Sequence, residues 1–294
     1  MLNPQLKPRK GLKRLLGSGL GLLLAGSLVT GCAKLVAQVL APPAAIDSVH
    51  LALGNPSAAT PDISNANNYL IVRPQYVLSY NRDKSIANWV SWQLNEDWLG
   101  QLPRSPFMPD PSLPRGWYRV TTGDYTGSGF DRGHLVPAAD RNATPEDSES
   151  VFWMTNIIPQ SPDNNQGPWE KLESYSRTLV RRGHTLYIIA GGAGEGGTAR
   201  NGSRTRIGRN NRISVPAAIW KIVVVLNAGQ TLEDIGTDTR VITVIMPNDM
   251  GIKDDDWRDY RESVDTIEAI TGYDFLSTVP EEIQEFLEAK TDSR

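Results

Sequence analysis

The chain has 294 residues, of which 39% are hydrophobic and 21% charged, an ordinary composition for a globular protein with one large or two small domains. Its single cysteine, Cys32, excludes an internal disulfide. With 30 basic and 33 acidic residues the formal net charge is −3, which by itself does not single out an anionic partner.

The start of the chain has the pattern of an export signal. Five basic residues and no acidic ones precede an apolar run, Leu15–Val29, that is too short to span a bilayer comfortably. The run leads into LVTGC, which resembles a bacterial lipobox and implies cleavage before Cys32 and lipidation of its thiol. The alternative is a spare thiol after an ordinary cleavage site.

These features predict three segments. Residues 1–31 form a lipoprotein-type signal peptide, residues 32–48 with their APPAA stretch form a tether, and residues 49–294 form a single domain. We therefore expect an exported lipoprotein of the cell envelope, facing the periplasm or lying at the cell surface, with a secreted form as the alternative.

Charge is unevenly distributed along the predicted mature chain. Without residues 1–31 it carries 25 basic and 33 acidic residues, a net charge of −8. Residues 254–294 alone hold 13 acidic and 4 basic residues. The middle of the chain is therefore much less acidic than the average.

Several segments have the residue pattern of β-strands. Tyr69–Asn81 predicts two short strands with a turn at Arg73-Pro74, and Ala87–Leu94 is rich in residues that favour strands. A proline-rich loop follows at Leu102–Pro114. Further apolar runs are VFWMTNIIPQ, which is closed by a proline, and three predicted buried strands, TLYIIAG, AIWKIVVVLN and RVITVIMPN.

Helical periodicity appears in two places, Trp169–Arg182 and Asp256–Thr271. The second is followed by Gly272, a residue type that often ends helices. Strands and helices alternate only loosely, and no regular βαβ repeat is present. The sequence thus predicts an α+β fold with a mixed or antiparallel sheet and packed helices.

The segment NNQGPWEKLESYSR, residues 164–177, places polar side chains at helical spacing. Proline at position 168 fits only the first turn, so the helix is expected to begin near Asn165 or Gln166. Asn165, Glu173 and Arg177 then share one side of the helix. The alternative is structural, with Asn165 as an N-cap and the other two as a surface ion pair.

The segment FDRGHLVPAADR, residues 130–141, contains His134, one of three histidines in the chain. Taken alone, it fits a turn at Gly133 and a histidine satisfied in the core. Together the two segments supply a candidate base, an amide oxygen for a metal ion, a carboxylate and several cations. Phosphodiester cleavage requires that set.

The motifs DRGH, TNxxPQ (residues 155–160) and NQGxWxxLExxxR resemble those of the DNA/RNA non-specific endonucleases, which are ββα-metal or His-Me finger nucleases. The resemblance is close to the bacterial sugar-non-specific nucleases and runs from about His50 to Ser277. His134 and Asn165 lie 31 residues apart, a separation typical of this family. The resemblance implies a ββα-metal finger within the α+β fold.

The resemblance also implies roles for individual residues. His134 would be the general base, and an ordinary histidine pKa near 6.5 suits that work. Asn165 would be the one direct protein ligand of Mg²⁺, for which Mn²⁺ is a possible substitute, and Glu173 would orient a water in the ion's hydration shell. Arg132 and Arg177 would hold the phosphate or the geometry of the site.

The family also carries an arginine upstream of DRGH that neutralises charge in the transition state. Arg104, in WLGQLPRSPF, is the best match, with Arg115 and Arg119 as competitors. Asn156 either supports the histidine and metal environment or is a buried structural amide.

Within the DRGH motif, we expect Asp131 to orient its neighbours, Arg132 in particular. We expect Gly133 to leave room for the histidine ring.

A glycine-rich basic segment, Gly191–Arg212, lacks the ending of a phosphate-binding P-loop. We interpret it as a flexible connection between strands. Its arginines either contact a nucleic-acid backbone or are simply solvated. They are Arg200, Arg204, Arg206, Arg209 and Arg212.

The predicted function is that of an endonuclease that hydrolyses DNA and RNA with little sequence preference and leaves 5′-phosphate ends. Two alternatives stay open. One is a phosphodiesterase or phosphatase of small nucleotides, and the other is a catalytically dead envelope lipoprotein that binds nucleic acid. An inhibitor protein is a conceivable partner that the sequence does not reveal.

Overall fold

The computed structural model describes residues 47–294. The predicted signal peptide and nearly all of the predicted tether, including Cys32, lie outside these residues. Between residues 47 and 294, no helix combines the length and the hydrophobicity needed to cross a membrane.

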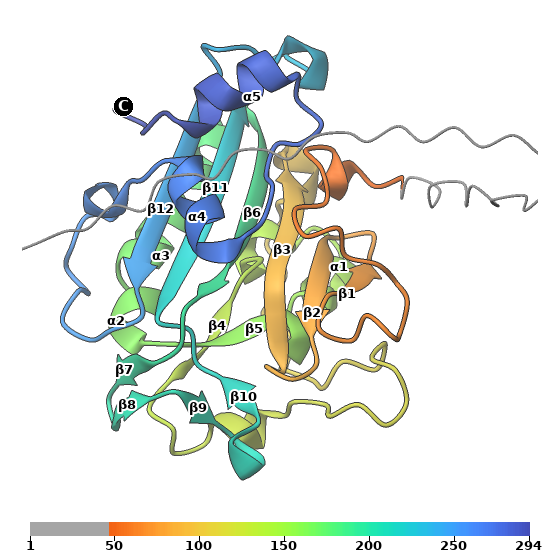
Figure 1. Cartoon of the computed structure of the whole chain (residues 1–294), viewed down its shortest axis with the longest axis vertical. Helices are drawn as coiled ribbons and strands as arrows, with labels where there is room; N and C mark the ends of the chain where they lie inside the picture. Colours follow the sequence, from red (N-terminus) through yellow and green to blue (C-terminus); the bar gives the residue numbers. More distant parts are fainter. Residues whose placement is uncertain (1–46) are drawn as a thin grey trace, which may run out of the picture. The chain divides into compact units, whose positions relative to one another are not determined.

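A six-stranded sheet forms the centre of the domain (Figure 1). Every strand pairs antiparallel with its neighbours, in the order β1-β2-β3-β6-β11-β12. The predicted strands are thus confirmed. Their bounds are β1 Tyr69–Val72, β2 Val77–Asn81, β3 Ile86–Leu94, β6 Thr185–Ala193, β11 Ala218–Leu226 and β12 Arg240–Pro247.

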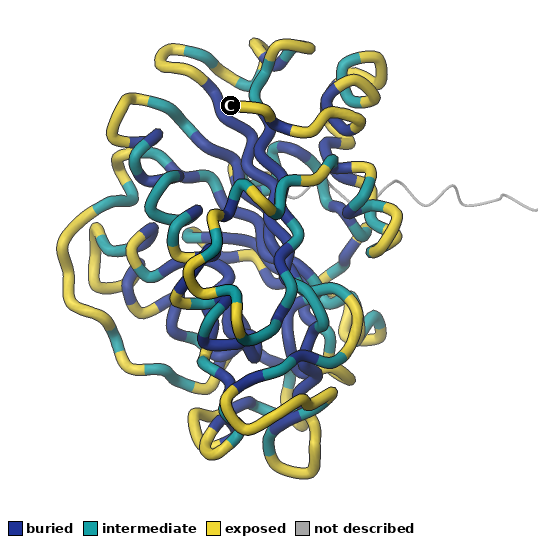
Figure 2. Tube along the Cα trace, turned by 90° about the vertical axis from the view of Figure 1, so that its left-hand side faces the viewer, coloured by how far each residue is buried: buried dark blue, intermediate teal, exposed yellow. Residues whose placement is uncertain are grey.

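The sheet is buried on both faces, because side chains of each strand alternate between two cores. In β6, Leu186 and Ile188 belong to one core, whereas Tyr187 and Ile189 belong to the other. Figure 2 shows these strands as buried segments running through the described region. Helix α3 (Pro168–Val180) contributes to the first core, and α4 (Val264–Thr271) and α5 (Glu281–Glu288) contribute to the second.

On the face that carries α3, a separate pair of antiparallel strands and the helices that follow it form a small ββα unit. Strand β4 (Asp131–His134) pairs antiparallel with β5 (Ile157–Gln160), and α2 (Pro162–Asn165) and α3 follow. This arrangement confirms the predicted α+β fold with its ββα finger. DRGH forms the whole of β4, and TNxxPQ leads into and forms β5.

The helix that was expected to begin near Asn165 is interrupted. Asn165 ends α2, and α3 begins at Pro168 after a break at Gly167. A side chain at Gly167 would lie 2.3 Å from the Asp163 carbonyl oxygen and 2.6 Å from that of Lys253. Asn165 therefore does not share a helix with Glu173, and its position depends on the turn between α2 and α3.

Two other predicted segments also differ from the structure. The helix expected at 256–271 begins only at Val264, with Ser263 as its N-cap, and ends as expected before Gly272, which has a φ of 72°. The segment 191–212 is not a flexible connection, since it forms most of two short antiparallel pairs. These are β7 (Gly197–Ala199) with β8 (Gly202–Arg204), and β9 (Arg206–Ile207) with β10 (Ile213–Ser214).

The remaining helical elements are short. They comprise the α-helix α1 (Pro145–Ser150) and the 3-10 turns η1 Val49–Leu51, η2 Glu96–Trp98, η3 Thr122–Tyr125, η4 Ala138–Asp140, η5 Met154–Asn156, η6 Arg209–Asn211, η7 Leu232–Asp234 and η8 Trp257–Tyr260.

Candidate active site

His134 ends β4 and lies between two phenylalanine rings. Its imidazole centroid is 5.2 Å from that of Phe107 and 4.8 Å from that of Phe152, which it meets edge-on. The residue is only 9% exposed, and its Nε2 is buried without a hydrogen-bond partner among residues 47–294. A buried ring nitrogen without a hydrogen bond destabilises the fold, so its presence here indicates a functional role for His134.

Two exposed arginines lie beside this histidine. The guanidinium of Arg104 is 5.2 Å from the Phe152 ring centroid, and that of Arg132 is 4.8 Å from the Phe107 ring centroid. Neither guanidinium forms an ion pair with a carboxylate in the described part of the chain. Their charge is therefore available to an anionic ligand.

Burial is the main reason that the pKa of His134 is lowered from 6.5 to about 3, and the positive charges of Arg104 and Arg132 lower it further. The imidazole is consequently neutral at neutral pH. The ordinary pKa near 6.5 that the sequence led us to expect is therefore wrong for the free enzyme. A neutral ring nitrogen can accept a proton, as a general base must, and an anionic group beside the two arginines would raise its pKa towards the neutral range.

Arg104 is placed by its loop, which runs along the segment that precedes β5. The Met108 amide donates to the Phe152 carbonyl (3.1 Å), and the Met154 amide donates to the Met108 carbonyl (2.9 Å). These bonds bring Arg104 and Phe107 to the histidine. Of the competing arginines, Arg119 donates to carbonyl oxygens of its own loop.

A pocket of about 280 Å³ opens in front of these groups. Arg104, Arg132 and Asn165 all line it. The remaining lining residues are Phe107, Tyr125, Thr126, Phe130 and Asp131. Its charged lining consists of two arginines and one carboxylate, Asp131, so the pocket carries a net positive charge that suits a phosphate.

Asp131 orients Asn165 rather than Arg132, contrary to the sequence-based expectation. Its carboxylate accepts a hydrogen bond from the side-chain amide of Asn165 (2.9 Å) and another from that of Gln166 (2.7 Å). Because the Asn165 nitrogen is held in this way, its amide oxygen is left without a partner in the described residues. That oxygen is a suitable ligand for a hard cation.

The neighbouring Asn164 has a structural role. Its side chain accepts a hydrogen bond from Gln160 (2.6 Å) and donates one to the Pro247 carbonyl (2.7 Å), and it is fully buried. Of the two adjacent asparagines, only Asn165 lines the pocket.

Gly133 is required by its neighbour on β5, not by the histidine ring as we expected. A Cβ at this position would lie 2.1 Å from Gln160 Oε1 and 2.6 Å from Gln160 Cβ. Asn156, in turn, is a buried structural amide. It accepts from the Val136 amide and donates to the carbonyls of Val136 and Val151, so it fixes the chain that leaves β4.

Glu173 and Arg177 project from α3 into a buried ionic network. Arg177 donates to Asp140 at 3.0 Å, and Lys221 of β11 lies 3.8 Å from Glu173. The ammonium of Lys221 is 3.9 Å from the Trp169 ring centroid, a cation–π contact. Burial raises the pKa of Glu173, while the charges of Lys221 and Arg177 oppose that rise.

The structure thus divides the predicted site residues into two groups. Arg104, Arg132 and Asn165 line the pocket, and His134 lies beside it, packed against the lining residue Phe107, whereas Glu173 and Arg177 do not line the pocket. Arg177 is only 8% exposed and is paired with the carboxylate of Asp140. Of its two expected roles, the structure therefore favours holding the geometry of the site over binding the substrate directly.

Sequence reasoning missed four residues around this site. The rings of Phe107 and Phe152 carried no recognisable signal. Asp140 was visible only as an acid within PAADR, and Lys221 as a single charge inside the apolar run AIWKIVVVLN. A charge within a predicted buried strand is a signal that could have been followed.

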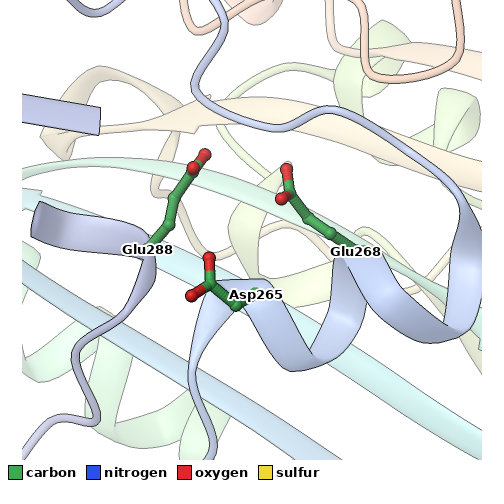
Figure 3. Close-up of side chains that lie close together, drawn as sticks. All are labelled: Asp265, Glu268 and Glu288. Atoms are coloured by element: carbon green, nitrogen blue, oxygen red, sulfur yellow. The ribbon is translucent and has the colours of Figure 1, made fainter. Parts of the chain in front are cut away.

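A second cluster of carboxyl groups belongs to the opposite core. Asp265 and Glu268 of α4 and Glu288 of α5 bring carboxyl oxygens within 4.8 Å of one another (Figure 3). Burial, reinforced by the charge of Glu268, raises the pKa of Glu288 to about 7. The Glu268 carboxylate accepts a hydrogen bond from the backbone amide of Phe275, and the Glu288 carboxylate accepts one from the side chain of Gln284. We therefore assign this cluster a structural role.

The chain was compared with known proteins. The family model of the DNA/RNA non-specific endonucleases matches residues 54–282. The chain belongs to this family. The endonuclease is 49% identical to a nuclease of Nostoc sp. over 280 residues, which are 93% of this chain and 98% of that protein.

Other relatives of the endonuclease are more distant. It is 33% identical over 182 residues to human mitochondrial endonuclease G and spans 59% of that protein's length. A crystal structure of an EndoG/EndoGI complex shares the fold, with a TM-score of 0.65 at 22% identity, over 80% of this chain and 92% of that one. The endonuclease is therefore a hydrolase that acts on nucleic acids and belongs to a family of metal-dependent enzymes.

Proposed function

We propose that the endonuclease cleaves phosphodiester bonds of both DNA and RNA at the pocket beside His134, leaving 5′-phosphate ends. The observation that carries this proposal is a neutral imidazole flanked by two exposed guanidinium groups that have no carboxylate partner in residues 47–294.

His134 takes a proton from the attacking water. Arg104 and Arg132 hold the non-bridging phosphate oxygens, and Arg104 neutralises the charge that grows on them as the bond breaks. The phenylalanines on either side of the imidazole exclude bulk water and keep the ring in one orientation. Because the ring is already held in one orientation, less entropy is lost when the proton is transferred.

Asn165 fits the metal ion that the family requires. Its free amide oxygen faces a pocket with an adjacent carboxylate, Asp131, and hard cations such as Mg²⁺ prefer oxygen ligands. When bound, Mg²⁺, or Mn²⁺ in its place, would supply positive charge to the phosphate and to the leaving oxygen. Asp131 holds Asn165, and Glu173, which lies 3.8 Å from Lys221, would orient a water in the hydration shell of the ion.

The test uses the purified full chain with supercoiled plasmid and, separately, a structured RNA, in Mg²⁺ or in EDTA. We expect loss of both polymers only with the metal ion, and a decrease of roughly 10²- to 10⁴-fold in the rate of His134→Ala. His184→Ala, which replaces a half-buried histidine that does not line the pocket, is the matched control, and circular dichroism checks that both variants fold. Intact plasmid and RNA in both Mg²⁺ and Mn²⁺ would refute the proposal.

The position of the cut is tested on the products. If they carry 5′-phosphate ends, polynucleotide kinase labels them only after phosphatase treatment. Labelling without that treatment would show 5′-hydroxyl ends and the opposite bond cleaved. Faster hydrolysis of small nucleotide esters than of polymers would instead favour a small-nucleotide phosphodiesterase.

The proposal includes export and a lipid anchor at Cys32, supported by the LVTGC motif alone. The full chain, expressed in a bacterium that is fed labelled palmitate, should become labelled and sediment with membranes. The Cys32→Ser variant should lose the label. Equal sedimentation and no label in either form would exclude the anchor.

A further inference from the structure

A second polar groove, separate from the histidine pocket, is lined by the segment from β9 to β10, by the turn between β2 and β3 and by residues 116–118. We define this basic groove by Arg82, Trp117, Tyr118, Arg206 and Arg212, and its volume is about 440 Å³. It shares no lining residue with the pocket beside His134.

The basic groove carries uncompensated positive charge. Arg206 donates only to backbone carbonyls, those of Asp83, Asn211 and Arg212, at 3.3–3.4 Å. The guanidinium of Arg212 lies 4.8 Å from the Tyr118 ring centroid, and neither arginine forms an ion pair within residues 47–294. The one carboxylate in the groove, Asp83, is already paired with Arg82 at 3.3 Å. The groove therefore has a net charge of about +2.

Its aromatic side chains are held in place. The ring of Trp117 meets Tyr69 edge-on at 5.1 Å and stacks with Tyr80 at 6.3 Å, and it is only half-buried. The Tyr118 hydroxyl donates to Asp124 at 2.5 Å. The guanidinium of Arg82 lies 5.8 Å from the Trp117 ring centroid, so a base that stacks with Trp117 would share the exposed part of the ring with Arg82 or displace it. Stacking of this kind is tolerant of sequence.

The groove and the active-site pocket share a scaffold. Asp124 accepts from both Tyr118 and the amide of Arg209 (3.0 Å), and the next residue, Tyr125, lines the pocket. Asn201, in the turn between β7 and β8, donates to the Gly127 carbonyl (2.9 Å) in the loop that leads to β4. Figure 1 shows β7 to β10 at the same end of the domain as β4.

We infer that the basic groove binds the nucleic-acid strand being cut, as an unpaired segment some nucleotides away from the cleaved bond. This rests on the proposed function and extends it to a second substrate contact. Arg206 and Arg212 neutralise backbone phosphates, and Trp117 stacks with a base. Of the five arginines in segment 191–212, Arg206 and Arg212 thus belong to this groove.

The test compares a polymer with a substrate too small to reach the groove. The variants are Arg206→Gln/Arg212→Gln and, to keep the three carbonyl bonds of Arg206, Arg212→Glu alone. The matched control is Arg181→Gln/Arg182→Gln, which removes the same charge from exposed positions after α3. Each is assayed on long single-stranded DNA and on bis(p-nitrophenyl) phosphate.

In the groove variants we expect KM for single-stranded DNA to rise about tenfold or more, with kcat and the hydrolysis of the small ester unchanged. The slope of log KM against log salt concentration should fall by about 1.4 for two lost phosphate contacts. A KM and a salt slope equal to those of the control variant would overturn the inference.

Binding of a labelled oligonucleotide to His134→Ala, followed by fluorescence anisotropy, separates this inference from the proposed function. If the enzyme cleaves and the groove substitutions leave both binding and KM unchanged, only the groove inference fails. If no polymer is cleaved but the groove substitutions weaken binding, the proposed function fails, and with it the claim that the bound strand is the one being cut, while the groove still binds nucleic acid.

Discussion

Acidification should destabilise the endonuclease through its buried histidines. The pKa of His134 is lowered from 6.5 to about 3 by burial and by the charges of Arg104 and Arg132, and that of His50 is lowered to about 4, chiefly by burial. Below pH 6.5 these imidazoles take up protons in the unfolded chain while they stay neutral in the fold. Stability is therefore lost as the pH falls from 6.5 towards each lowered pKa.

The size of this loss follows from proton linkage. Between pH 7 and pH 5 each histidine should remove roughly 2 kcal/mol from the free energy of unfolding, or about 4 kcal/mol together. Such a loss is a large part of the stability of an ordinary domain. Urea denaturation followed by tryptophan fluorescence at pH 7, 6 and 5 measures it.

The variant His134→Asn separates this contribution from the other titrating groups. Asparagine takes up no proton, so the loss between pH 7 and pH 5 should be smaller by roughly 2 kcal/mol than in the parent chain. His50→Asn should show a decrease of similar size. An unchanged pH dependence in His134→Asn would mean that the imidazole has an ordinary pKa in the fold, and the reasoning would be wrong.

The same lowered pKa sets the pH dependence of activity. In the free enzyme His134 is already neutral at pH 5, so the kcat/KM profile should show no acid limb near pH 6.5. A phosphate between Arg104 and Arg132 compensates part of their charge and raises the pKa of His134. The acid limb of kcat should therefore lie at higher pH than that of kcat/KM, and a limb of kcat/KM centred near 6.5 would contradict this.

Three further predictions concern packing and buried charge. Gly133→Ala should lower the free energy of unfolding by about 1–3 kcal/mol and reduce activity, since its Cβ would overlap Gln160; thermal denaturation and plasmid cleavage test both effects. Lys221→Met should cost about 3–5 kcal/mol because it leaves Glu173 buried without its partner, and adding Glu173→Gln should restore part of that loss; equal stability of the single and double variants would show that the two do not interact. Glu288→Gln should stabilise the chain by about 1–3 kcal/mol at pH 8 and by much less at pH 5, because a carboxyl whose pKa is raised from 4.5 to about 7 destabilises the fold progressively between those two pH values; an equal effect at both pH values in urea denaturation would contradict it.

The positions of the strands were predictable because they depend on local patterns. Runs such as TLYIIAG and AIWKIVVVLN are apolar throughout and end at turn residues, and both became central strands buried on two faces. The start of α3 was harder to predict. Its break at Gly167 results from the close approach of Lys253, which is distant in the sequence.

The candidate active site was likewise predictable only where local sequence patterns determine it. The motifs around His134 and Asn165 indicated the chemistry, since residue type and order alone carry it. Nothing local shows that Asp131 bonds to Asn165 rather than to Arg132, or that Arg177 meets Asp140. These partners come from separate elements.

The sequence by itself determined the family and the fold class and indicated candidate site residues, because motifs and hydrophobic periodicity are properties of neighbouring residues. Only the tertiary structure decided which charges are paired and which are free. Lys221 faces Glu173 because strand alternation places it on the side of α3, and Arg104 reaches His134 because its loop pairs with the segment before β5. Such contacts depend on how distant elements pack, and packing is fixed only when the whole core is assembled.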